Sequence, residues 1–426
     1  MDTTEKILED HIKSTFEDMD RIQAEIDTTQ DYEEFGIKAK AMQSLTNKVF
    51  HFLTPMQMLD FTKGKLYHYE VEGEDYLVVD GKNLKVAMSE DYNFIFNKNN
   101  GMFMRWGKTY EDDPEYSPIG PEILDLEISV NGCPNNCRFC YKNNTNEPAT
   151  NMSFETFKKI IDSFPKTLTQ VAFGITGVQT NPDFIKMMEY CREIGVVPNF
   201  TLSGIDLTDD IAKKISKLVG ALAVSAYKSD KNVCYNTVKK FTDLGIRQTN
   251  IHLLVATETL DFVYEVLNDR INDNRLSRMG SIVFLGVKPK GRAKDGFHSL
   301  STDQYKKLIN FCFDNGISCG FDSCSCPKYE AAIKDMDLPQ DKKDGLIGYG
   351  ESCESSLLSS YINVRGEYWH CSFSEKEDGI KSINCLDYDD FLKVWYSDVV
   401  KEFRNKSIAG MIDGCRYCTV FPSINI

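Results

Sequence analysis

The sequence lacks long apolar runs, and its N-terminus lacks an apolar core. No stretch approaches the ~20 apolar residues that a membrane-spanning helix needs. The first ten residues, MDTTEKILED, are charged and do not resemble a secretory signal. We therefore expect a cytoplasmic protein that does not associate with a membrane.

A surplus of positive charge is also missing. The chain has 64 acidic and 49 basic side chains, for a formal net charge of -15. Such a surface repels phosphate backbones, so a nucleic-acid partner is not expected.

Cysteine, in contrast, is abundant, with 14 among 426 residues. Disulfides are rare in the cytoplasm, where clustered cysteines more often bind metal or take part in catalysis. The clusters lie at 133–140, 319–326 and 415–418. Cys191, Cys234 and Cys312 stand alone in apolar or helical patterns and are interpreted as buried packing residues.

The residue pattern changes twice along the chain. Helical periodicity over 4–26 and 32–51 is followed by β-forming segments over 65–107, with a hairpin turn at Asn99-Asn100-Gly101. An acidic, proline-rich stretch at 111–122 is typical of a linker. These features predict an N-terminal helical and β-hairpin extension over 1–118, a core domain over 119–330 and a C-terminal domain over 331–426.

The core domain alternates strands with helices. Nearly continuous apolar runs are typical of strands buried on both faces of a parallel sheet. The pattern predicts an α/β fold, either a barrel or a doubly wound sheet, with its chemistry at the carboxyl ends of the strands. The runs cover 123–130, 170–175, 197–202, 221–227, 250–256, 281–287 and 317–322.

Three cysteines follow the first of these strands at once. Cys133-x3-Cys137-x2-Cys140 supplies three thiolates, enough for three irons of a cubane, and leaves the fourth iron open for a small chelating ligand. The alternatives are a zinc site or chance spacing. Zinc prefers four protein ligands, and no histidine lies nearby in the sequence.

This spacing, with Phe139 before the third cysteine, resembles the signature of the radical S-adenosylmethionine (SAM) superfamily. The resemblance covers roughly 123–322. It implies a partial (β/α)6 TIM-like barrel and a [4Fe–4S] cluster on Cys133, Cys137 and Cys140. It also implies reductive cleavage of SAM to a 5′-deoxyadenosyl radical, which abstracts a substrate hydrogen.

Further family motifs match in part. Gly174-Ile175-Thr176-Gly177 stands where the family usually has Gly-Gly-Glu-Pro, and the run 288–293 resembles a family Gly-Arg-Ala. The glutamate and proline are missing, so the residues that hold the SAM amino group are not defined by this match. The resemblance implies cofactor contacts at Phe139, Tyr141, Gly174, Thr176, Gly177, Ser203, Ser225 and Val287. His252 alternates with apolar neighbours in the run 250–256, which predicts a cofactor contact inside the barrel, with an ordinary core histidine as the alternative.

The C-terminal cysteines resemble the Twitch domain, a shortened SPASM domain. They follow the pattern Cys353-x12-Gly366-x4-Cys371, then Cys415-x2-Cys418. A hairpin turning at Arg365-Gly366 would bring the first two together. The resemblance implies an auxiliary [4Fe–4S] cluster on Cys353, Cys371, Cys415 and Cys418, with a four-cysteine structural zinc site as the alternative.

Candidates for substrate chemistry lie at the ends of the last two strands. Asp322 and Cys324 follow one, and Lys288 and Arg292 follow the other. Cys324 is a candidate hydrogen-atom donor or cluster ligand, and the two basic residues are candidates to bind an anionic substrate group or the SAM carboxylate. The sequence does not define functional roles for Cys319, Cys326 and Cys385. Cys385 is interpreted as a packing residue.

Three functions remain open. The first is an oxidoreductase-type radical SAM enzyme that modifies a peptide by crosslinking, epimerisation or oxidation. The second is a small-molecule dehydrogenase or cyclase. The third is a non-catalytic iron–sulfur electron carrier, which the three-cysteine motif disfavours because a carrier normally uses four cysteines. Either enzyme needs a reducing partner such as flavodoxin or ferredoxin.

Overall fold

The computed structural model describes residues 3–26, 63–109, 111–412 and 415–425, together with some positions between 34 and 45. The chain divides into two compact units, Met1–Ile119 and Gly120–Ile426, which are described separately below. Among the described residues, no helix is long and apolar enough to cross a membrane.

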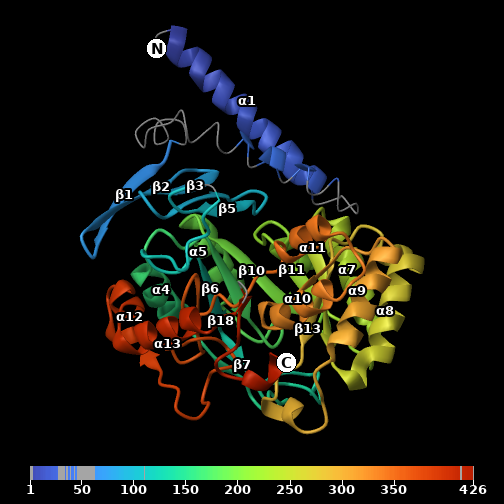
Figure 1. The fold of residues 1–426 in the computed structure, drawn as a ribbon. Coiled ribbons are helices and arrows are strands. Elements are labelled where there is room, and N and C mark those ends of the chain that lie inside the picture. The colour runs from blue at the N-terminus through green and yellow to red at the C-terminus, as the bar shows by residue number, and fades with distance from the viewer. Residues whose placement is uncertain are drawn as a thin grey trace. The chain divides into compact units, whose positions relative to one another are not determined.

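The N-terminal unit consists of one long helix and an antiparallel sheet (Figure 1). The predicted helix over 4–26 and the turn at Asn99–Gly101 are confirmed, whereas the helix predicted over 32–51 lies largely outside the described residues. The elements are α1 (Thr3–Ile26), β1 (Lys65–Val71), β2 (Glu74–Asp80), β3 (Leu84–Met88), β4 (Asn93–Asn97) and β5 (Phe103–Trp106).

The core of this unit forms between α1 and the sheet. Met19 and Ile22 of α1 pack with buried Val79, Val86 and Ile95 of neighbouring strands. The unit therefore has an apolar core of its own.

The second unit is built on a parallel sheet. The seven strands predicted from apolar runs are all present and hydrogen-bond to one another in chain order. Sequential parallel order follows when each crossover places the next strand beside the last. The strands are β6 (Ile123–Glu127), β9 (Gln170–Gly174), β10 (Val197–Leu202), β11 (Leu222–Ser225), β12 (Thr249–Val255), β13 (Ile282–Gly286) and β14 (Cys319–Phe321).

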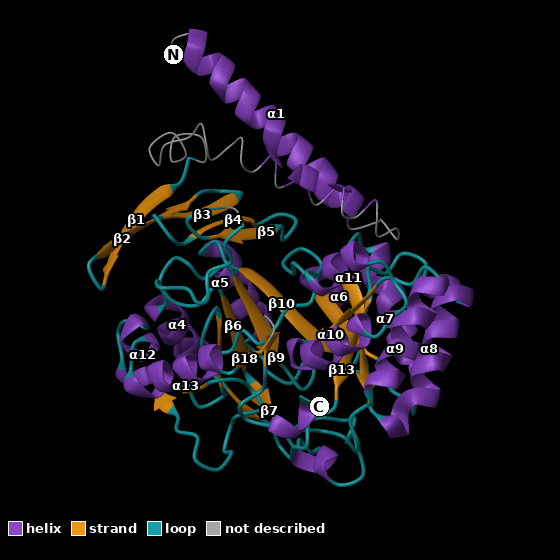
Figure 2. Cartoon of the chain, viewed as in Figure 1, coloured by secondary structure: helices purple, strands orange, loops and turns teal. Residues whose placement is uncertain are grey.

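Amphipathic helices cover this sheet and bury their apolar sides in a single large core (Figure 2). Side-chain caps mark where several of them begin: Ser153, Thr208 and Ser301 each accept a backbone N–H of the first turn. The helices of the core are α4 (Phe154–Ser163), α5 (Phe184–Glu193), α6 (Asp209–Ile215), α7 (Lys231–Asp243), α8 (Leu260–Asn272), α9 (Thr302–Asp314) and α10 (Cys326–Lys334).

A C-terminal hairpin continues the same sheet. Strands β15 (Ser359–Ile362) and β16 (Glu367–Trp369) form the predicted hairpin, with Gly366 at a positive φ of 80°. β15 also pairs in parallel with β6, and β16 pairs with β17 (Ile383–Asn384). The sheet thus runs across the boundary predicted at 330, and a separate domain over 331–426 remains a prediction.

The remaining C-terminal elements are short. They are α11 (Gln340–Ile347), α12 (Leu392–Trp395), α13 (Asp398–Ala409), β18 (Met411–Ile412) and β19 (Cys415–Arg416).

Candidate active site and metal-binding cysteines

The first cysteine motif forms a tight loop at the carboxyl end of the sheet. β6 and the two-residue strand β7 (Ser129–Val130) lead into it, and Asn131 and Gly132 both have positive φ. Backbone hydrogen bonds close the loop: the Cys133 N–H donates to the Thr145 carbonyl at 2.8 Å. The Asn181 carboxamide donates to the Ile128 carbonyl just before β7, which fixes the strand end that carries the loop.

The three thiols of this loop are close to one another and half-buried. Burial raises the pKa of Cys137 to about 11, and the nearby Cys133 and Cys140 act in the same direction. The Tyr227 hydroxyl hydrogen-bonds to Cys137.

Arg292 holds the loop from outside. It lies in a 3-10 turn (Gly291–Lys294), and its Nε donates to the Cys137 carbonyl at 2.8 Å. Its Nη2 donates to the Asn144 carbonyl at 3.0 Å and its backbone N–H to the Cys140 carbonyl at 3.0 Å. The sequence predicts that Arg292 binds an anionic substrate group or the SAM carboxylate, and in the structure its guanidinium donates to two loop carbonyls. Arg292 is a positioning residue for the cysteine loop.

Gly291 makes this close approach possible. A Cβ at this position would lie 2.4 Å from the Tyr141 carbonyl oxygen, and its φ is 59°. The Gly-Arg-Ala run recognised in the sequence therefore packs directly on the cysteine loop.

Aromatic and apolar side chains surround Phe139. Its ring stacks on Tyr227 at 6.2 Å between centroids and meets Phe297 edge-on at 5.8 Å. It also packs against the small apolar cluster that contains Ala256 and Val287. Phe139 and Val287, both predicted cofactor contacts, thus lie in one apolar patch beside the cysteines.

Other predicted cofactor residues lie at successive strand ends. Gly174 ends β9 and Ser225 ends β11, while Ser203 follows β10 directly. The Thr176 hydroxyl is buried and has no hydrogen-bond partner among the described residues. A Cβ on Gly177 would lie 2.6 Å from an Asp206 carboxylate oxygen and 2.8 Å from the Thr180 hydroxyl, so these two side chains pack closely against the glycine.

His252 lies on β12, which pairs with β11 on one side and β13 on the other. Its Nδ1 is 3.2 Å from the Thr201 hydroxyl. Burial lowers the pKa of His252 to about 4, although the Asp322 charge acts in the opposite direction. The imidazole is therefore neutral near pH 7.

A cavity of about 320 Å³ opens next to the C-terminal elements. Four cysteines line it: Cys324, Cys353, Cys371 and Cys418. Burial raises the pKa of Cys371 to about 12, with Cys353 and Cys418 acting in the same direction. Burial likewise raises the pKa of Cys324, and Cys353 and Cys371 add to the shift. The four thiols therefore face a common space.

Backbone N–H groups also point at these sulfurs. The Phe421 N–H donates to the Cys418 sulfur at 3.2 Å. The backbone of Phe373 and Ser374 lowers the pKa of Cys371, against the larger effect of burial. Hydrogen bonds of this kind stabilise sulfur in its anionic, metal-bound form.

Charged side chains share the cavity wall. Lys288 forms an ion pair with Asp322, and Asp322 also accepts the Gly286 N–H at 3.2 Å. Burial lowers the pKa of Lys288, but the charges of Asp322 and Cys324 outweigh it and raise that pKa overall. Asp125 of β6 also lines the cavity and is exposed to it, and desolvation by the surrounding protein raises its pKa to about 6. Lys288, Asp322 and Cys324, predicted as catalytic, are thus brought together.

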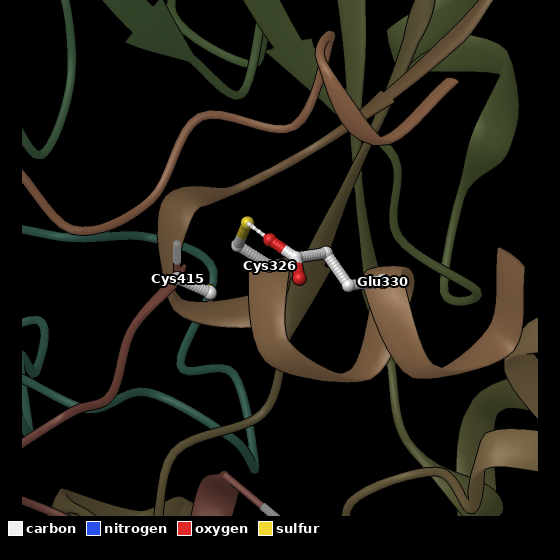
Figure 3. A group of neighbouring side chains, drawn as sticks. All are labelled: Cys326, Glu330 and Cys415. Atoms are coloured by element: carbon white, nitrogen blue, oxygen red, sulfur yellow. Dashed lines mark hydrogen bonds between the residues drawn. The ribbon is translucent and has the colours of Figure 1, made fainter. Parts of the chain in front are cut away.

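Cys415 is not among the residues that line this cavity. It lies instead beside Cys326 and Glu330 of α10, with the three ligand atoms within 4.8 Å of one another (Figure 3). The sequence grouped Cys415 with Cys353, Cys371 and Cys418. Cys324 lines the same cavity as Cys353, Cys371 and Cys418, and the ligand set with Cys415 remains a prediction.

A buried ionic network that the sequence analysis missed joins the two regions. Lys142 Nζ lies 2.9 Å from Glu127 Oε1 and also contacts Glu375 and the Tyr361 hydroxyl. Tyr141, a predicted cofactor contact, stacks on Phe373 at 4.5 Å beside it. The only signal in the sequence was the position of Lys142 two residues after Cys140.

A protein-family model matches part of the core. Residues 128–269 match the model of the radical SAM superfamily. One curated relative, the tungsten-containing aldehyde ferredoxin oxidoreductase cofactor-modifying protein of Pyrococcus furiosus, is 30% identical over 101 residues. That alignment covers 23% of this chain, and the chain spans only 28% of that relative's length.

Solved structures share the fold over a larger part of the chain. Streptococcus suis SuiB bound to the precursor peptide SuiA superposes with a TM-score of 0.58 at 12% identity, covering 77% of this chain and 90% of that one. The protein anSMEcpe with bound AdoMet and the Kp18Cys peptide gives 0.51 at 16% identity, covering 72% and 88%. At these identities the likeness establishes the fold, a parallel α/β sheet of the TIM-like kind.

Proposed function

We propose, from the match of residues 128–269 to the radical SAM superfamily model, that the protein abstracts a hydrogen atom from a peptide, using SAM and two [4Fe–4S] clusters. The observation that carries the proposal is the presence of two separate cysteine sets in one unit. One has three thiols on a loop after β7, and the other has four around a cavity.

The first set fits a [4Fe–4S] cluster with one open iron. Cys133, Cys137 and Cys140 supply three thiolates, and Arg292 together with the loop's backbone hydrogen bonds holds them in place. A reduced cluster of this kind, with SAM bound, supplies a 5′-deoxyadenosyl radical for hydrogen abstraction.

The residues around this loop fit a polar organic cofactor. Thr176 offers a buried hydroxyl without a partner among the described residues. Phe139 and Val287 provide an apolar wall. These groups would bind and orient SAM and keep water from the reacting atoms.

For the second set, we assign the auxiliary cluster to Cys324, Cys353, Cys371 and Cys418. All four line the same cavity, and backbone N–H groups hydrogen-bond to two of the sulfurs. In this proposal Cys324 replaces Cys415, which the sequence analysis grouped with the other three cysteines.

A peptide substrate is supported by the two solved relatives, which were determined with peptides bound. A small-molecule substrate is the second candidate, since the curated relative is described as modifying a cofactor. In both cases a low-potential donor such as ferredoxin or flavodoxin supplies the electron.

Metal content tests the two clusters. After anaerobic reconstitution, we expect about eight irons per chain in the wild type and about four in the Cys133/Cys137/Cys140→Ala variant. Cys324→Ala should lose iron from the second cluster, whereas the buried Cys234→Ala of α7 should keep the wild-type content. About four irons in the wild type, or a full complement in Cys324→Ala, would contradict the assignment.

The activity has its own readout. With dithionite and SAM, the wild type should release 5′-deoxyadenosine and the triple variant should not. Failure of the fully iron-loaded wild type to do so would leave the electron-carrier function. Mass loss in a peptide encoded beside this gene would support the peptide substrate over the small-molecule substrate, provided that small molecules are not turned over.

A further inference from the structure

Asp125 brings a carboxylate to the cavity that the four cysteines line. It lies in the middle of β6, where its neighbours Leu124 and Leu126 are fully buried in the core. Successive side chains of a strand point to opposite faces, so Asp125 points away from that core. The residue is exposed and lines the cavity of about 320 Å³.

The other charged side chains of the cavity wall have partners. Lys288 and Asp322 form an ion pair with each other, and Arg416 donates two hydrogen bonds. Glu354 is engaged as well. No hydrogen bond or ion pair joins Asp125 to another residue that the structure describes. Its pKa of about 6 leaves the carboxylate ionised near pH 7.

An ionised carboxylate without a partner favours a positively charged ligand. Withdrawing a carboxylate from water is costly unless a cation or hydrogen-bond donors take the place of the water. A [4Fe–4S] cluster on four thiolates would add further negative charge to the same space. The electrostatics of the cavity therefore favour a cation over a neutral or anionic group.

Apolar and aromatic side chains form much of the remaining wall, among them Ile123, Phe373, Phe403 and Phe421. Phe373 already receives a cation, since the Lys288 ammonium lies 4.9 Å from its ring centroid. Aromatic rings attract cations, and apolar walls cover the aliphatic stems of long charged side chains. Lysine and arginine side chains combine such a stem with a charged end.

The cavity wall also contacts the first cysteine loop. Tyr141 follows Cys140 directly, and its ring stacks on that of Phe373 at 4.5 Å between centroids. Phe373 and Asp125 line the same cavity. A group bound at Asp125 thus lies in a space that residues of both cysteine sets border, where a substrate must be held for hydrogen abstraction.

We propose that Asp125 binds the positively charged end of a lysine or arginine side chain of the substrate, and that this contact holds the substrate between the two cysteine sets. The inference rests on the proposed function and specifies its substrate class, a peptide that carries a basic residue close to the one that reacts.

Three matched probes test the charge preference. They are the N-acetyl methylamides of lysine, arginine and norleucine, of which the last is a neutral counterpart of lysine. Each is titrated calorimetrically into the full-length, iron-loaded protein in the presence of SAM. We expect the lysine and arginine probes to bind at least about tenfold more tightly than the norleucine probe, the factor expected from one charge-assisted hydrogen bond.

Two variants locate the contact. Asp125→Asn removes the charge and keeps the shape, so it should bind the lysine and arginine probes about tenfold more weakly and the norleucine probe as the wild type does. Asp389→Asn, at a carboxylate whose side chain is 86% exposed, is the matched control and should bind all three probes like the wild type. Wild-type iron content in both variants shows that the fold is intact.

Equal affinity of the wild type for the lysine and norleucine probes would overturn the proposal, and this comparison needs no variant to fold. Unchanged binding of both charged probes to iron-loaded Asp125→Asn would overturn it as well. Butylamine that binds as tightly as the lysine probe would replace the peptide by a free amine. The proposed function fails separately: iron-loaded protein that prefers the lysine probe but releases no 5′-deoxyadenosine keeps the Asp125 site and loses the radical chemistry.

Discussion

His252 shows how one partly buried side chain sets a pH dependence. Burial lowers its pKa from 6.5 to about 4, so the folded protein holds it neutral while the unfolded chain protonates it. A lowered pKa contributes stability that is complete above pH 6.5 and is lost as the pH falls towards 4. The free energy involved is at most about 3 kcal/mol.

We therefore expect His252→Gln to remove part of the acid sensitivity of the second unit. The free energy of unfolding of the wild type should fall relative to the variant between pH 6.5 and 4.5, as measured by denaturant titration. His68→Gln, at an exposed position of β1, is the control and should follow the wild type. A constant difference between wild type and His252→Gln across this range would contradict the pKa shift.

Individual residues also show which parts of the candidate site could be predicted from the sequence. The first cysteine motif was predictable because its three ligands are consecutive in one loop. The place of Cys415 beside Cys326 and Glu330 was not, because the Cys415-x2-Cys418 spacing does not show which residues each thiol contacts. Arg292 was singled out in the sequence, but its hydrogen bonds to the cysteine loop were not predicted. Its partner Cys137 lies 155 positions away, and such a contact leaves no local sequence pattern.

At the scale of elements, the Lys142 network joins the cysteine loop to β6 and to the C-terminal hairpin. Lys142 pairs with Glu127 of β6 and with Glu375, and Tyr361 of β15 donates to Glu375 at 3.1 Å. Both carboxylates are at most 10% exposed at the side chain. Removing the one ammonium group that both share would leave two buried carboxylates side by side.

We expect Lys142→Met to destabilise the second unit by about 3–5 kcal/mol, the usual result of breaking a buried ion pair from one side. Thermal unfolding of the reconstituted protein measures this. Lys158→Met, whose ion pair with Asp162 is exposed, should cost less than about 1 kcal/mol. Equal effects of the two substitutions would argue that the network adds no stability.

The strands of the parallel sheet were largely predictable from the sequence. Seven apolar runs became seven parallel strands because strands buried on both faces need apolar residues throughout. The hairpin at Arg365-Gly366 was predicted from its turn, but its parallel pairing with β6 was not. That pairing joins segments that are distant in the chain. The alternation of residues in a strand does not show which other strand it pairs with.

At the scale of the whole molecule, the cysteine sets connect distant parts of the second unit. The first set lies on the loop after β7, and the four cavity cysteines come from the end of β14 and from three segments of the C-terminal region. A cluster that binds only the folded arrangement stabilises it by mass action. The first unit, Met1–Ile119, contains no cysteine and has its own core.

Iron removal should therefore affect the two units differently. In calorimetry of the full chain, anaerobic chelation should lower the Tm of the larger transition by about 10 °C or more, a shift that corresponds to several kcal/mol. The transition of the first unit should not move and serves as the internal control. The Cys133/Cys137/Cys140→Ala variant should fall between the loaded and the iron-free protein. If chelation strips the iron and the larger transition stays in place, the cysteines do not hold clusters that fasten the C-terminal segments to the sheet.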